Sequence, residues 1–168
     1  NYYSRFYFVH PDGAGQHYDK KHLFTFGGEH KRFTAGTERV VVNFRGVRIL
    51  LEVCYDLRFP VWARNLGDYD MILYVASWPT PRVDAWSALL RARAIENQCY
   101  VAGVNRMGVD PACEYSGGSA IIDPYGKTIA ECPWSRESAV SADIDMEALQ
   151  AFRKKFPVLD DADPFTLI

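Results

Sequence analysis

An apolar run, a helical pattern and a second apolar run follow one another in the middle of this chain and constrain its fold most. The six residues MILYVA, 71–76, are apolar throughout, as expected for a strand that is covered on both faces. Residues 83–98 give a long helical pattern, and residues 99–105 give another strand. Three apolar residues share one face of the helix: Trp86, Leu90 and Ala94. This alternation predicts βαβ units and therefore an α/β fold with parallel central strands.

Two hairpins are predicted before this central region. Residues 5–9 and 17–20 contain aromatic side chains and flank the turn residues PDGAG, a pattern typical of two antiparallel strands. Residues 39–44 and 47–53 are rich in β-branched side chains and meet at Arg45-Gly46, so they are also expected to pair. The last of these strands leads directly into Cys54.

Weaker patterns cover the rest of the chain. Pro60 and Gly67 suit the first and last positions of a short helix, and residues 106–118 are expected to form a loop. The remaining predicted elements are strands at 119–123 and 128–132 around the turn PYGK, a last strand at 139–144, and a helix at 146–156 that Asp145 caps and Pro157 ends. The tail from residue 157 to residue 168 is expected to be irregular and exposed.

Composition excludes several classes of protein. The chain has 168 residues, which fits one domain, and its 19 Lys and Arg against 21 Asp and Glu give a net charge of −2. A chain without excess positive charge has no general attraction for a phosphate backbone, so we expect no nucleic-acid partner. The longest nearly continuous apolar run, residues 71–78, is far shorter than the roughly 20 residues that span a bilayer, so we expect no membrane partner.

Cysteine and histidine positions indicate neither a metal site nor a disulfide framework. The cysteines, at 54, 99, 113 and 132, lack the paired spacing of zinc sites, and all the histidines lie in the first thirty residues without an i, i+4 pair. The sequence contains no glycine-rich phosphate loop and no dinucleotide fingerprint, so no cofactor is expected. The opening NYYSRFYFV does not have the pattern of a signal peptide, and we expect reduced thiols in a cytoplasmic protein.

Cys54 is the strongest candidate for chemistry when the residues are taken one by one. It lies at the carboxyl end of an apolar strand, where open α/β sheets place reactive groups. A helix N-terminus and a nearby cation would both favour the thiolate, the form of cysteine that acts as a nucleophile. The alternative is a buried structural thiol. Lys20, near a strand end, and Glu29, in a polar loop, are by position alone more typical of a solvated surface.

Five strings, in this order along the chain, together resemble the carbon–nitrogen hydrolase (nitrilase) superfamily, and especially its omega-amidase branch: YDKKHLF, GGEHKRFTAG, VCYDLRFP, SWP and RARAIENQCYV. The resemblance runs from residue 2 to residue 168, and VCYDLRFP is its most specific motif. It implies an α/β fold of the four-layer α-β-β-α sandwich type. Residues 1–168 would form one carbon–nitrogen hydrolase domain that is incomplete at its N-terminus, so we expect this chain to be the C-terminal two-thirds of a member.

The resemblance also implies a set of site residues. Cys54, the cysteine of CYD, matches the family's nucleophile, and Lys20 matches the lysine that stabilises the tetrahedral oxyanion. Glu29 matches a glutamate that supports this lysine and the substrate amide, and Tyr55 would lend its backbone N–H to the oxyanion hole. A further glutamate of the family, its general base or acid, belongs to a segment upstream of residue 1.

The reaction implied by the resemblance is hydrolysis of the terminal (omega) carboxamide of a small dicarboxylate monoamide, such as 2-oxoglutaramate. Ammonia would leave through a cysteine thioester intermediate, without a cofactor or metal. A cation should hold the distal carboxylate, and three arginines are candidates: Arg58, Arg91 and Arg93. Trp78 is a candidate apolar wall of the pocket, and the family resemblance implies a homodimer.

Three alternatives stay open at this point. Nitrile hydrolysis and N-carbamoyl cleavage use the same constellation of residues, so the motifs do not choose among these reactions. An inactive scaffold or binding protein could keep the fold, and the glutamate missing from this sequence favours that interpretation. A thiol-protease arrangement would instead pair Cys54 with one of the early histidines.

Overall fold

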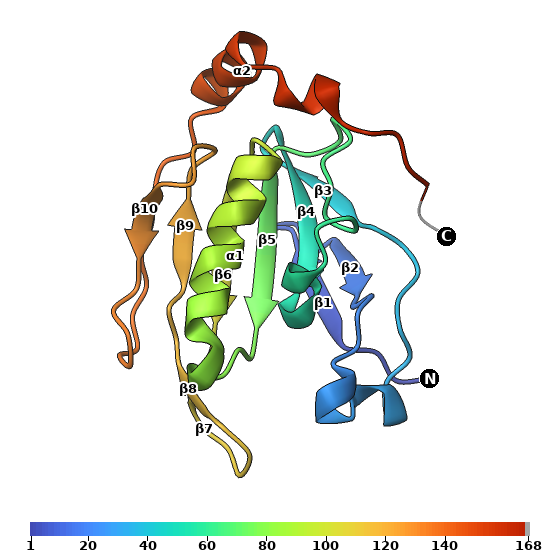
Figure 1. The fold of residues 1–168 in the computed structure, drawn as a ribbon. Helices are drawn as coiled ribbons and strands as arrows, with labels where there is room; N and C mark the ends of the chain where they lie inside the picture. Colours follow the sequence, from blue (N-terminus) through green and yellow to red (C-terminus); the bar gives the residue numbers. More distant parts are fainter. Residues whose placement is uncertain (167–168) are drawn as a thin grey trace.

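A mixed sheet of six strands forms the centre of the computed structural model, which describes residues 1–166 (Figure 1). From one edge to the other the strands are β10 (Thr128–Glu131), β9 (Ala120–Ile122), β6 (Tyr100–Asn105), β5 (Met71–Ala76), β4 (Val47–Val53) and β3 (Val41–Phe44). The three central strands β4, β5 and β6 are parallel, whereas the outer pairs are antiparallel. The parallel core predicted from the alternating pattern is therefore confirmed.

Helix α1 (Val83–Glu96) connects β5 to β6 and packs on one face of the sheet (Figure 1). Its predicted inner face is confirmed, because Trp86, Leu90 and Ala94 are all buried. The helix lies very close to β6 at Gly103, where an added Cβ would stand 2.6 Å from Leu90 Cδ1. Only a glycine permits this approach, since any side chain would overlap the helix.

The hairpin of β1 (Arg5–Val9) and β2 (Gly15–Asp19) covers part of the other face. Tyr18, fully buried, packs there with the β3 and β4 side chains Val42 and Leu51. The β3–β4 hairpin turns at Arg45 and Gly46, both with positive φ, as a two-residue turn between twisted strands requires. Both predicted N-terminal hairpins are thus present.

The short helix predicted at Pro60–Gly67 is wrong. A 3₁₀ helix, η3 (Cys54–Arg58), begins directly at the end of β4, and residues 60–67 form turns instead. The N–H of Asn65 donates to Asn97 Oδ1 (2.9 Å), and Asn65 Nδ2 donates to the carbonyls of Tyr69 and Asn97. Side chains therefore satisfy polar groups that a helix would have satisfied within its own backbone.

Two further predictions need correction. The expected loop 106–118 contains a small hairpin, β7 (Met107–Val109) and β8 (Glu114–Ser116), whose turn is held by hydrogen bonds to the Asp110 carboxylate. Residues 139–144 do not form a strand, because no described strand pairs with them and a strand needs a ladder partner. The predicted β9–β10 hairpin is confirmed, with an irregular register between Thr128 and Ala130.

The C-terminal region follows the prediction closely. Helix α2 (Met146–Lys155) is capped by Asp145, whose carboxylate accepts from the N–H of Ala148 (2.8 Å), and it ends before Pro157. The tail is not wholly irregular, because it includes the 3₁₀ helix η5 (Val158–Asp161). Its last residues, 167–168, lie outside the described residues.

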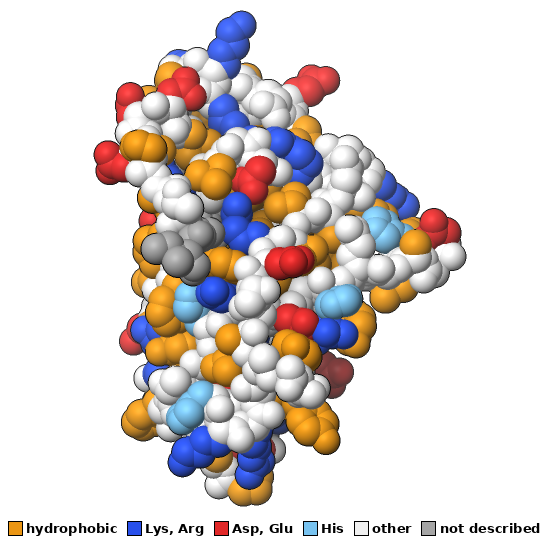
Figure 2. Space-filling model, turned by 90° about the vertical axis from the view of Figure 1, so that its right-hand side faces the viewer, with side chains coloured by type: hydrophobic (Ala, Val, Ile, Leu, Met, Phe, Trp, Pro, Cys, Tyr) orange, Lys and Arg blue, Asp and Glu red, His pale blue; other side chains and the backbone are white. Residues whose placement is uncertain are grey.

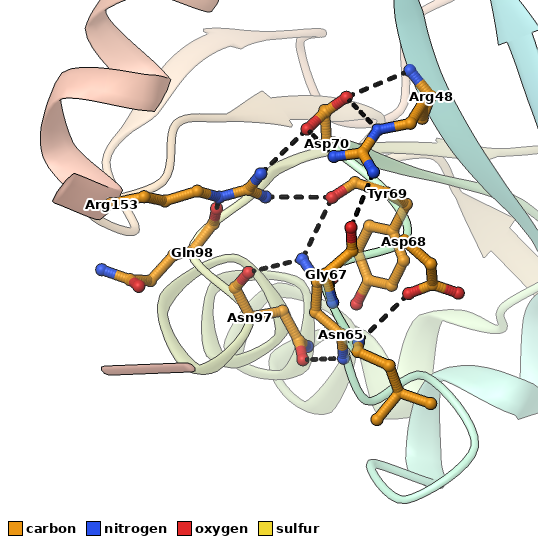
Figure 3. A network of polar contacts seen from close by, with 10 residues as sticks. Arg48, Asn65, Gly67, Asp68, Tyr69, Asp70, Asn97, Gln98 and Arg153 are labelled. Atoms are coloured by element: carbon orange, nitrogen blue, oxygen red, sulfur yellow. Dashed lines mark hydrogen bonds and ion pairs between the residues drawn. The ribbon is translucent and has the colours of Figure 1, made fainter. Parts of the chain in front are cut away.

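A polar network fixes α2 to the amino ends of the parallel strands (Figure 3). Arg153 of α2 donates to Asp70 Oδ1 (2.8 Å) and to the carbonyls of Tyr69 and Gln98. Arg48 donates to both oxygens of the same carboxylate. Burial acts to raise the pKa of Asp70, but the bonds from Arg48 and Arg153 outweigh it and lower that pKa. The network thus joins α2, β4 and the loop before β5 through one ionised group.

The surface carries both signs of charge. On the face shown in Figure 2, Lys and Arg side chains alternate with Asp and Glu side chains, and hydrophobic side chains show between them. Among the described residues, no helix is both long and apolar enough to cross a membrane.

Candidate active site

A cavity of about 560 Å³ opens at the carboxyl ends of β4 and β5. Its walls come from the end of the β1–β2 hairpin, from η1 (Thr25–Gly27) and η2 (Glu29–Lys31), from η3, from η4 (Thr80–Arg82) and from the β7–β8 hairpin. Six of the eight candidate site residues line it: Lys20, Glu29, Cys54, Tyr55, Arg58 and Trp78. The fold therefore gathers into one cavity residues that lie up to 58 positions apart, from Lys20 to Trp78.

Cys54, the first residue of η3 directly after β4, occupies a strained backbone position. Its φ is +48°, a region that residues other than glycine seldom adopt and that often marks a functional site. The thiol lies against the carbonyl of Ser77, with Sγ 3.9 Å from that oxygen. Burial raises the pKa of the Cys54 thiol, and the Lys20 ammonium only partly offsets this effect. Desolvation therefore outweighs the nearby cation, which by itself would favour the thiolate.

Lys20, which is buried, and Glu29, which is partly exposed, form an ion pair on the cavity wall. Lys20 Nζ is 2.6 Å from Glu29 Oε2, and the lysine side chain is only 2% exposed. Glu29 Oε2 also accepts from the N–H of Phe24 (2.7 Å), and the N–H of Lys20 donates to the carbonyl of Ser4 (2.9 Å). Both charges are thus held in place on the wall of the site, contrary to the surface interpretation that their positions alone favoured.

A second buried network ties the lysine's strand to the cysteine's loop. Asp56, two residues after Cys54, accepts from the hydroxyl of Tyr18 (2.9 Å) and from the N–H groups of His22 (2.9 Å) and Val53 (3.1 Å). The Tyr18 hydroxyl in turn accepts from the N–H of Lys21. Sequence reasoning missed this network, although the aspartate stands inside the most specific motif, because hydrogen-bond partners 34 and 38 positions away leave no local pattern.

The thiol-protease interpretation finds no support in this geometry, because no histidine lines the cavity among the described residues. His22 is engaged elsewhere: its Nδ1 is 2.8 Å from Asp56 Oδ1, and its ring stacks on Phe59 at 3.8 Å. Glu29 is the one acidic side chain on the cavity wall within residues 1–166. Four other glutamates were candidates for a general base within this chain, and none of them lines the cavity: Glu38, Glu52, Glu96 and Glu114.

The candidate arginines separate clearly. Arg58 lines the cavity, with its guanidinium carbon 5.0 Å from the centroid of the Trp78 ring. Arg91 donates to the carbonyl of Gly126, and buried Arg93 donates to the carbonyl of Leu57 and to Glu96, and neither of these two candidates lines the cavity. Arg82, which no sequence pattern singled out, does line the cavity.

Trp78 belongs both to the core and to the cavity wall that was predicted for it. It is 3% exposed and packs in the core against Trp86, with ring centroids 5.5 Å apart, yet it also lines the cavity. Asn105 clamps its backbone by accepting from its N–H (2.7 Å) and donating to its carbonyl (2.9 Å). The ring of Tyr55 packs edge-on against Phe24, on the same wall.

An α/β fold with a thiol and an ion pair at the carboxyl edge of its parallel strands defines a protein of the nitrilase type. The chain belongs to the carbon-nitrogen hydrolase family, whose sequence model matches residues 1–154. The chain is 53% identical over 165 residues to the omega-amidase YafV of Escherichia coli (strain K12), covering 98% of this chain and 64% of that protein. It is 42% identical over 146 residues to the 2-oxoglutaramate amidase of Bacillus subtilis (strain 168), covering 86% and 56%.

Solved structures agree with this assignment. The crystal structure of XC1258 from Xanthomonas campestris, a CN-hydrolase superfamily protein with an arsenic adduct in its active site, matches with a TM-score of 0.95 and 48% identity. The match covers 98% of this chain and 65% of that protein. This chain therefore spans less than two thirds of the length of these relatives, between 56% and 65%. Two predictions go beyond these comparisons: that a second sheet completes the four-layer sandwich, and that residues 1–168 are an incomplete domain.

Proposed function

We propose that the protein carrying this chain is an amidohydrolase that cleaves the omega-carboxamide of a small dicarboxylate monoamide. The observation that carries the proposal is the meeting of Cys54, Lys20 and Glu29 in one cavity, at the end of a parallel strand pair. A thiol beside a fixed ammonium supplies a nucleophile and a donor for the oxyanion, the two groups that acyl transfer from an amide requires.

In this proposal Cys54 Sγ attacks the amide carbon and gives up its proton, and the negative charge moves to the carbonyl oxygen. Lys20 Nζ and the backbone N–H of Tyr55 donate to that oxygen. The amide nitrogen takes up a proton and leaves as ammonia, so that an acyl thioester remains on Cys54. Water then attacks the thioester, and the acid product and the free thiol are released.

A proton acceptor is essential, because burial raises the pKa of the Cys54 thiol and so disfavours the thiolate. Glu29 is already bonded to Lys20 through Oε2, and we assign it to holding the lysine and the amide. We assign the base to the family's further glutamate, which the resemblance places upstream of residue 1.

The names of the relatives support this substrate class over the alternatives. Two of them, at 53% and 42% identity, are named an omega-amidase and a 2-oxoglutaramate amidase. Arg58 on the cavity wall adds a cation for the carboxylate that such substrates carry. We further propose a cytoplasmic homodimer, in line with the free thiols of all four cysteines and with the family resemblance.

The test is Cys54→Ala in the intact protein, with ammonia release from 2-oxoglutaramate and from glutaramate as the assay. The variant should lose turnover by at least about 1,000-fold while keeping its fold, because no covalent intermediate can form. Mass spectrometry of the wild-type protein under turnover should find an acyl group on Cys54. Cys113→Ala, which removes another cavity thiol, is the matched control and should stay active. Turnover of Cys54→Ala within tenfold of wild type would refute the proposal.

A further inference from the structure

We infer that Arg82, assisted by Arg58, forms an anion subsite that binds the distal carboxylate of the substrate and selects charged over neutral amides. This inference rests on the proposed function and adds to it the residue that decides specificity. Both arginines line the same cavity as Cys54, Lys20 and Glu29.

The backbone of Arg82 is fixed within the loop that follows β5. Its N–H donates to the carbonyl of Pro79 (3.0 Å), and its own carbonyl accepts from Trp78 Nε1 (2.7 Å). Trp78 is itself clamped by Asn105. The start of the Arg82 side chain is therefore held in place, and little order has to be gained when a ligand binds.

Aromatic rings hold both guanidinium groups. The Arg82 guanidinium carbon is 5.4 Å from the centroid of the Phe24 ring, and that of Arg58 is 5.0 Å from the centroid of Trp78. Both rings also line the cavity. A ring that packs on the face of a guanidinium leaves the N–H groups at its edge free, in the fork geometry that fits a carboxylate.

The charges of the cavity wall do not balance. Four charged side chains line it, and Lys20 and Glu29 neutralise each other at 2.6 Å. Within residues 1–166, neither Arg58 nor Arg82 has a carboxylate within 4.0 Å, and neither side chain donates a hydrogen bond. Arginines elsewhere in the fold, such as Arg48 and Arg153, are paired with a carboxylate.

Two unpaired cations on the wall of a partly closed cavity favour a ligand with negative charge. A neutral amide or nitrile would leave both cations without a partner, whereas a carboxylate at the far end of the substrate would accept from them. Arg82 is half-buried and Arg58 is exposed, so water screens Arg82 less. Arg82 should therefore contribute more to the discrimination than Arg58.

The test compares two amides of equal chain length in the intact protein: glutaramate, which carries a distal carboxylate, and pentanamide, in which a methyl group replaces it. Arg82→Met should lower kcat/KM for glutaramate by about 10- to 100-fold, mainly through KM, because a charge-assisted bond is lost. Hydrolysis of pentanamide should change less than threefold. Arg82→Lys should restore part of the loss, and Arg58→Met should show a smaller effect of the same kind.

Arg91→Met is the matched control, since that guanidinium bonds the carbonyl of Gly126 away from the cavity. An equal loss on both amides in Arg82→Met would mean a structural role, and an unchanged glutaramate rate would mean no role; either overturns the inference. If the wild-type protein hydrolyses neither amide, the proposed function fails separately. Glutarate binding by calorimetry then tests the subsite alone, and Arg82→Met must weaken that binding at least tenfold or the inference is refuted.

Discussion

Lys20→Met is the substitution that separates chemistry from stability most sharply in this protein. Methionine has nearly the length of lysine and no charge, so it can occupy the same buried space. The lysine side chain is 2% exposed and its Nζ lies 2.6 Å from Glu29 Oε2, which makes it a fixed donor in a water-poor site. Loss of one such donor to an oxyanion costs about 2.7–4 kcal/mol of transition-state stabilisation, or about 100- to 1,000-fold in kcat.

The expected effect on folding is much smaller. Glu29 loses one charge-assisted bond, but its side chain is 28% exposed and it keeps the bond from the N–H of Phe24, so its charge can be rehydrated. We expect a change of at most about 2 kcal/mol in the free energy of unfolding. A domain stable by about 5 kcal/mol that loses about 2 kcal/mol is still more than about 99% folded, so unfolding cannot account for a 100-fold loss of rate.

The assay is ammonia release from glutaramate at saturation, with urea unfolding of the same samples. Lys21→Met is the matched control, because that ammonium lies over the Trp62 ring at 5.1 Å and does not line the cavity. Glu29→Gln completes a double-mutant cycle, and its effect should be strongly non-additive with Lys20→Met since the two groups act as a pair. Equal losses in the two lysine variants, or a Lys20→Met rate within tenfold of wild type, would refute the reasoning.

Two further predictions concern the pKa of Cys54 and the contribution of Arg153 to stability. Because burial raises the pKa of Cys54, its alkylation by iodoacetamide, followed by mass spectrometry, should increase with pH to a midpoint above the ordinary thiol value. Lys20→Met should move that midpoint higher, because it removes the cation that lowers the pKa. A midpoint below the ordinary value would contradict this prediction. Arg153→Met should lower the free energy of unfolding, measured by urea denaturation, by about 2–4 kcal/mol, because the bonds to Asp70, Tyr69 and Gln98 are lost together. The control Lys154→Met, at an exposed neighbouring position, should change it by less than about 0.5 kcal/mol. Equal effects of the two substitutions would show that the network contributes nothing.

Local patterns in the sequence determined the framework of the sheet. The run of residues 71–76 is a central strand, because a strand covered on both faces is apolar throughout. Trp86, Leu90 and Ala94 are the inner face of α1, because a helix that packs on one face is apolar with a period of 3.6. The Asp145 cap and the stop at Pro157 were also readable, since caps act within a few residues of their partners. The motif VCYDLRFP, through its resemblance to the family, singled out the position of the Cys54 thiol.

Only the tertiary structure decided how the site residues meet and which state they are in. Lys20 is a buried side chain paired with Glu29 rather than a surface charge, and burial raises the pKa of Cys54 despite the nearby cation, because both outcomes depend on segments distant in sequence. The turns at residues 60–67 replace a helix because Asn97, some thirty positions away, supplies their hydrogen bonds. Arg82 has no sequence signal at all: its position in the cavity follows from the packing of Trp78 and Phe24 around it, and such packing depends on the whole fold rather than on any local stretch of residues.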